Sequence, residues 1–112
     1  ENDTAKALSM KKASLGQGWE TNPEKFYDFA EWCLQRKINL IEAKKYALKS
    51  AKRASAGPFK GKILKTTAEI YYALGDTKTA VSLMEAAMEQ DPANDYYETI
   101  WNDFREKLNN SD

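Results

Sequence analysis

The sequence has 112 residues, of which 42% are hydrophobic and 30% charged, a balance typical of one globular domain with an apolar core. Residues 1–60 hold 12 basic and 7 acidic side chains, whereas residues 61–112 hold 5 and 10, so the formal charge of 0 is unevenly spread. Proteins that bind nucleic acid usually carry a net basic surface, so we do not expect this protein to bind nucleic acid. The sequence also contains no run of about 18 apolar residues, so we expect no membrane span.

Histidine is absent, and Cys33 is the only cysteine. This composition removes the commonest general base, excludes an intrachain disulfide and disfavours a transition-metal site. Cys33 lies in an apolar stretch, where we expect a buried and unreactive thiol. We therefore expect no catalytic residue, no cofactor and no metal. Because the chain begins with Glu1, we interpret it as a segment of something longer.

Residues 1–21 are expected to form a short helix followed by a loop. Alanine, leucine and methionine alternate with lysine, which predicts that Ala5, Leu8 and Met10 face the rest of the protein. After Ser14, two glycines in three residues predict a break.

Residues 22–56 are expected to form a first antiparallel helix pair. An Asn-Pro-Glu sequence opens it, with asparagine as the cap and proline at the first helical position. The second helix, residues 39–55, carries the small residues Ala43 and Ser50 where it meets the first. The apolar face of the first helix holds Phe26, Phe29, Ala30 and Cys33.

Residues 61–94 give the clearest prediction of a second pair. Gly75 permits the left-handed conformation that ends a helix, and Asp76 can cap the next one. Small Ala80 and Ala87 allow two antiparallel helices to approach closely. One face of the first helix holds Leu64, Thr67, Ala68, Tyr71 and Leu74.

Residues 95–109 predict a terminal helix. Asp95 followed by Glu98 has the layout of a capping box. An apolar stripe on an otherwise polar helix suits an element that covers the end of a helical stack. That stripe holds Tyr97, Ile100, Trp101, Phe104 and Leu108.

The spacing within residues 61–94 resembles a tetratricopeptide (TPR) unit, a helix-turn-helix repeat of 34 residues. The resemblance implies an all-α fold, namely a TPR-like α-solenoid over residues 1–112. In this fold two antiparallel helix pairs stack on each other, with a flanking helix at each terminus.

A narrower resemblance covers residues 22–92. Its motifs are Asn22-Pro23, Phe29-Ala30-Glu31-Trp32, a basic alanine-rich helix, Thr67-Ala68-Glu69-Ile70-Tyr71-Tyr72 and Leu74-Gly75-Asp76. This combination is similar to the helical segment that follows thioredoxin-like domains in some bacterial proteins. The redox domain is not in this chain, so the resemblance assigns no catalytic residue.

In TPR arrays the first helix of each pair lines a concave groove, which implies a site for a protein or peptide partner. The family's carboxylate clamp pairs lysine with asparagine; Lys65 fits the lysine position, but Glu69 replaces the asparagine and argues against capture of a C-terminal carboxylate. The matching groove positions are Glu24, Tyr27, Glu31, Leu34, Lys62, Lys65, Glu69 and Tyr72.

Three hypotheses for function remain. The first is a non-catalytic interaction or scaffold module. The second is an accessory domain of a thioredoxin-like thiol-disulfide oxidoreductase, cytoplasmic or periplasmic, whose redox domain could itself be the partner. The third is an enzyme, which would have to use an acidic helix face such as that of Glu24, Asp28 and Glu31. These three carboxylates could also bind a cation. We expect instead that they form an ordinary solvated face. We expect the same of the basic face formed by Lys45, Lys49, Lys52 and Arg53.

Overall fold

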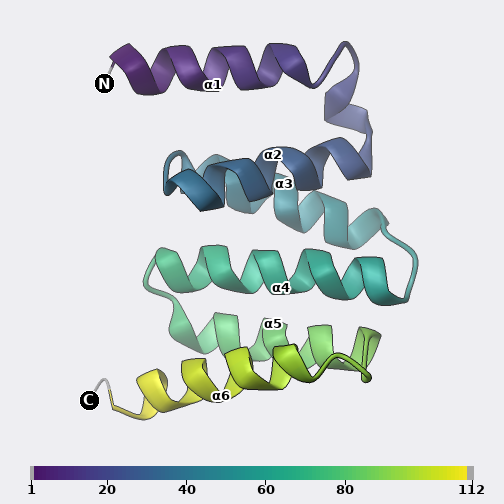
Figure 1. Cartoon of the computed structure of the whole chain (residues 1–112), viewed down its shortest axis with the longest axis vertical. Coiled ribbons are helices and arrows are strands. Elements are labelled where there is room, and N and C mark those ends of the chain that lie inside the picture. Colours follow the sequence, from purple (N-terminus) through teal and green to yellow (C-terminus); the bar gives the residue numbers. More distant parts are fainter. Residues whose placement is uncertain (1, 111–112) are drawn as a thin grey trace.

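The computed structural model describes residues 2–110, which form six α-helices, one 3-10 turn and no strand (Figure 1). The prediction of an all-α protein is confirmed. Within this range no helix is both long enough and apolar enough to cross a membrane. In chain order the elements are α1 (Asn2–Ser14), η1 (Trp19–Thr21), α2 (Pro23–Arg36), α3 (Leu40–Arg53), α4 (Pro58–Ala73), α5 (Thr77–Gln90) and α6 (Asp95–Asn109).

Successive helices lie across the long axis of the molecule, stacked along it and running in alternating directions (Figure 1). Each helix from α2 onward packs on the next one in the chain, and α2 also contacts α4. As a result α2, α4 and α6 all run in the same direction, with α4 between the other two (Figure 1).

The predicted helix starts at Asn22 and Asp76 are confirmed by their capping bonds. The Asn22 Oδ1 atom accepts a hydrogen bond of 3.0 Å from the backbone N–H of Glu24. Gly75 has a φ of 94°, and the Asp76 Oδ1 atom accepts a bond of 3.1 Å from the backbone N–H of Thr79. Each such cap stabilises its helix by about 1 kcal/mol.

The predicted cap of the last helix was wrong by one residue. Asn94 is the cap, because its Oδ1 atom accepts a hydrogen bond of 3.1 Å from the backbone N–H of Tyr96. Asp95 is the first residue inside α6, where its negative charge still favours the helix N-terminus.

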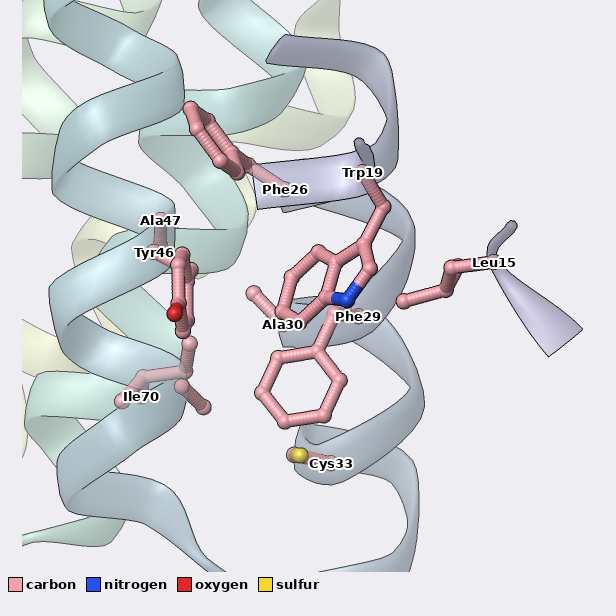
Figure 2. Packing of buried hydrophobic residues seen from close by; sticks show 10 residues of the cluster. Leu15, Trp19, Phe26, Phe29, Ala30, Cys33, Tyr46, Ala47 and Ile70 are labelled. Carbon is pink, nitrogen blue, oxygen red and sulfur yellow. The ribbon is translucent and has the colours of Figure 1, made fainter. Parts of the chain in front are cut away.

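A first apolar cluster joins η1, α2 and α3 (Figure 2). The Trp19 ring lies 5.3 Å from the Phe29 ring and 4.9 Å from the Tyr46 ring, measured between centroids. The sequence pattern gave Trp19 no role, because the short turn that buries it has no helical period. Ile70 of α4 belongs to the same cluster, so the cluster reaches beyond the first helix pair.

α4 is buried on two sides, whereas the sequence predicted one apolar face. Ile63, Thr66 and Ile70 are fully buried in addition to most of the predicted face, because α4 packs against both α3 and α5. The hydroxyl of Thr67, also buried, donates a hydrogen bond of 2.8 Å to the carbonyl of Ile63, so its polar atom is satisfied. Leu74, expected on the apolar face, is 36% exposed.

The contact between α4 and α5 is unusually close at Gly61. A Cβ atom at Gly61 would lie 3.2 Å from the Ala87 carbonyl oxygen and 3.3 Å from the Gln90 Cβ atom. The side chain of Gln90 also accepts a hydrogen bond of 2.8 Å from the backbone N–H of Gly57. This bond holds the start of α4, which begins at Pro58, earlier than expected.

α1 packs differently from the prediction. Leu8 is half-buried against the first cluster, and Leu15 just beyond the helix is buried. Ala5 and Met10, which were expected to face the protein, are exposed, and Met10 retains 63% of its accessible surface. The alternation of alanine with lysine therefore did not mark a buried face.

Two ion pairs attach α1 to the neighbouring helices. The Lys11 Nζ atom lies 3.1 Å from a carboxylate oxygen of Asp28, and the Lys12 Nζ atom lies 3.0 Å from one of Glu42. Partial burial disfavours the charged form of Glu42, but hydrogen bonds from Lys12 and Asn39 outweigh it and lower the pKa of Glu42.

Cys33 lies on α2 within the first cluster and is fully buried (Figure 2). Burial disfavours the thiolate, and the nearby Glu42 carboxylate adds to this, so the pKa of Cys33 is raised from 9.0 to about 11. The expectation of a buried thiol is confirmed.

We predict that replacing Ala87 by leucine destabilises the protein by about 1 to 3 kcal/mol, because the larger side chain overpacks the contact with α4. Ser82 is exposed on the same helix, so Ser82→Leu is the matched control and should shift the thermal midpoint little. An unchanged melt for Ala87→Leu would refute this helix packing.

We further predict that Cys33 reacts with Ellman's reagent only after unfolding. Because the pKa of Cys33 is raised, its protonated thiol stabilises the folded state. This contribution to the free energy of unfolding is fully present below pH 9.0 and is lost as the pH rises to about 11. Native protein near neutral pH should therefore show almost no thiol that reacts with the reagent, and protein in concentrated guanidinium chloride should show one reactive thiol per chain. Rapid labelling of the native protein would contradict the buried position.

Candidate functional site

A groove of about 1210 Å³ crosses the side of the molecule on which α2, α4 and α6 run. Side chains from all three helices line it, and α4 supplies the strip between the other two (Figure 1). The lining mixes apolar and charged groups. The apolar part consists of Leu34, Tyr72, Ala73, Tyr96, Ile100 and Phe104.

Most of the groove residues predicted from the sequence lie in this lining. α2 contributes two of them and α4 contributes three: Glu31, Leu34, Lys65, Glu69 and Tyr72. The structure thus brings one turn of α2 next to two turns of α4. The remaining three, Glu24, Tyr27 and Lys62, lie outside the lining.

Tyr27 lies outside the groove because it packs against the start of α4. Its ring meets the Phe59 ring edge-on at 5.8 Å, and the Lys62 Nζ atom lies 5.5 Å from its centroid. Thr66 places its hydroxyl 3.5 Å from the Tyr27 hydroxyl. Burial is the main reason why the pKa of Tyr27 is raised. These contacts cover Tyr27, and the part of α2 that lines the groove is its C-terminal half.

α6 forms a wall of the groove that sequence reasoning missed. Tyr96, Ile100 and Phe104 line it, although the sequence suggested only that this helix covers the end of the stack. The adjacent pair Tyr96-Tyr97 was an available signal, since neighbouring residues on a helix point in different directions. Tyr97 is buried in the core, whereas Tyr96 is 59% exposed and faces the groove.

A stacked aromatic pair lines part of the groove. The Tyr72 ring of α4 and the Phe104 ring of α6 lie 4.5 Å apart and are inclined by only 13°. Phe104 is buried beneath this contact, and Tyr72 remains partly exposed. The Lys107 Nζ atom lies 5.8 Å from the Tyr72 ring centroid. Tyr72 therefore offers a rigidly held aromatic surface to a ligand.

Lys65 and Glu69 form an ion pair on the groove floor, with 3.3 Å between the Nζ and carboxylate oxygen atoms. Burial would lower the pKa of Lys65, but the charge and hydrogen bond of Glu69 outweigh it, so the pKa of Lys65 is raised. For Glu69, burial dominates over the attraction of Lys65, and its pKa is raised. Nearby Glu31 adds repulsion to that effect.

Glu31 reaches into the same region from α2. Its carboxylate accepts hydrogen bonds of 3.1 Å from the Thr66 hydroxyl and 3.0 Å from the Gln35 amide. Both donors are neutral. Through residues 2–110, no lysine or arginine forms an ion pair with Glu31.

The acidic face of α2 is divided between different contacts. Asp28 pairs with Lys11 of α1, Glu31 bonds to α4, and Glu24 is exposed in the first turn. Over the described part of the chain, no group of three acidic or cysteine side chains is arranged to hold a metal ion.

The basic side chains of α3 lie over the aromatic rings of the first cluster. The Lys49 Nζ atom is 5.4 Å from the Tyr46 ring centroid, and the Arg53 guanidinium is 5.5 Å from that of Phe26. Their stems and charges thus shield the rings from solvent, which is a structural use of this face.

Comparison with known proteins gives no assignment: no family model matches the chain, and no curated protein or solved structure shows a significant match.

Proposed function

We propose that this chain is a TPR-like α-solenoid that acts as a non-catalytic interaction module. Its partner, a peptide or an extended segment of another protein, binds in the groove across α2, α4 and α6. The groove itself carries this proposal, because alternate helices of equal direction line one concavity, the arrangement that the TPR resemblance implies.

The packing within the helix pairs supports the TPR-like interpretation. Ala80 and Ala87 are fully buried, and Gly61 permits close approach at the same contact. The turn at Gly75 and the cap at Asp76 then reverse the chain between α4 and α5. These features are what a helix-turn-helix repeat requires of its sequence.

The groove chemistry suits recognition of a side-chain pattern. Tyrosine surfaces supply contact area at low entropic cost, and charged groups beside them select the orientation of a ligand. Tyr72 and Tyr96 provide the aromatic contact area, and Lys65 and Glu69 provide the charged groups. A catalytic role receives no such support, because the chain lacks histidine and Cys33 is buried.

The resemblance over residues 22–92 favours a second role, as the accessory domain of a thioredoxin-like protein. In that role the groove would position a partner for a redox centre elsewhere in the parent chain, since Cys33 is buried here. A Cys-x-x-Cys motif in the flanking coding sequence would support it, and its absence there would exclude it.

We predict that Tyr72→Ala weakens peptide binding by about 1 to 2 kcal/mol, because the substitution removes an aromatic anchor from the groove. Fluorescence anisotropy would measure this with a labelled peptide selected on the wild-type protein from a random peptide library. Circular dichroism should show the same helicity for both proteins.

Lys45→Ala on the exposed face of α3 is the control and should leave affinity within error. If Lys45→Ala weakened binding while Tyr72→Ala did not, the partner would bind the basic face and the groove proposal would fail.

A further inference from the structure

The charges around the groove are unbalanced. Two lysines, Lys37 and Lys65, line it. Carboxylates outnumber them there: Glu31, Glu69, Asp103 and Glu106. A groove with this excess of negative charge attracts a positively charged ligand and repels an acidic one.

Internal pairing leaves part of this negative charge uncompensated. Lys65 forms an ion pair with Glu69 at 3.3 Å, and Lys107 forms one with Asp103 at 3.6 Å. These two pairs neutralise two of the carboxylates. Glu31 receives only the neutral donors described above. Among residues 2–110, Lys65 is the one basic side chain within ion-pair distance of Glu31 or Glu69, and Lys37 attracts Glu69 from farther away.

The lack of a second paired cation matters most for Glu69. It is half-buried on the groove floor, so water compensates its charge only in part. The pKa of Glu69 is raised by this burial and by the repulsion from Glu31, against the attraction of Lys65 and Lys37. An additional cation beside these two carboxylates would relieve both effects.

Resting on the proposed function, we infer that the groove selects a basic peptide segment. One arginine or lysine of that segment binds beside Glu31 and Glu69, and its apolar neighbours lie on Tyr72 and Tyr96. Arginine fits better than lysine, because its planar guanidinium can bond to carboxylates and stack on a tyrosine ring at the same time.

The test begins with a display library of random twelve-residue peptides panned on the immobilised wild-type chain. Peptides that bind should be enriched in arginine and lysine. The strongest of them is labelled, and its affinity is measured by fluorescence anisotropy. We expect Glu31→Gln to weaken it about tenfold, because the variant removes one charge and keeps the shape of the side chain.

Two further variants make the result specific to this site. Glu69→Gln should also weaken the peptide, and raised salt should reduce affinity for the wild type more than for Glu31→Gln. Glu89→Gln removes an exposed carboxylate of α5 outside the groove lining and should leave affinity unchanged. Thermal melts of all three variants show whether each is folded.

The possible outcomes separate the two proposals. Selected peptides without basic enrichment, sensitive to Tyr72→Ala but not to Glu31→Gln, would overturn the basic-peptide inference and leave the groove function intact. If no peptide depended on Tyr72 or Glu31, both would be overturned. Equal losses for Glu31→Gln and Glu89→Gln would show general charge attraction and would likewise contradict the inference. Self-association detected by light scattering and weakened by Glu31→Gln would contradict it in favour of a second copy as the occupant.

Discussion

Burial of α4 on two sides joins the first apolar cluster to a second one, formed mainly by α4, α5 and α6. Ile70 belongs to the cluster of α2 and α3, while Ile63 and Ala68 belong to the cluster of α5 and α6. Because α3 and α5 occupy these two sides, only a narrow strip of α4 remains open. Lys65, Glu69 and Tyr72 lie on that strip, so the packing of the core determines the groove floor.

The helix boundaries and pairings were largely predictable from the sequence, because they depend on local chemistry. An asparagine cap before Pro23 and the Gly75-Asp76 turn act within a few residues of themselves. Ala80 and Ala87 were likewise recognisable as small residues at a helix contact, and both are fully buried. The shift from Asp95 to Asn94 shows the usual uncertainty between two neighbouring residues that can both cap a helix.

The groove was predictable only in part, since it depends on contacts between distant segments. Of the positions taken from the TPR resemblance, Glu31 and Tyr72 line the groove of the structure, but the resemblance could not show that Phe59 packs on Tyr27. Nor could periodicity show that α6 has a second role, because the stripe that buries Tyr97 says nothing about Tyr96. Trp19 was missed for a similar reason: a short 3-10 turn carries no periodic signal.

An NMR chemical-shift map with a library-selected peptide tests most directly whether ligands bind in the groove lined by α2, α4 and α6. We expect the largest perturbations on the backbone amides of Glu31, Glu69 and Ile100, one from each helix of the groove. Perturbations confined to the face of α3 that carries Lys45 and Lys49 would contradict it.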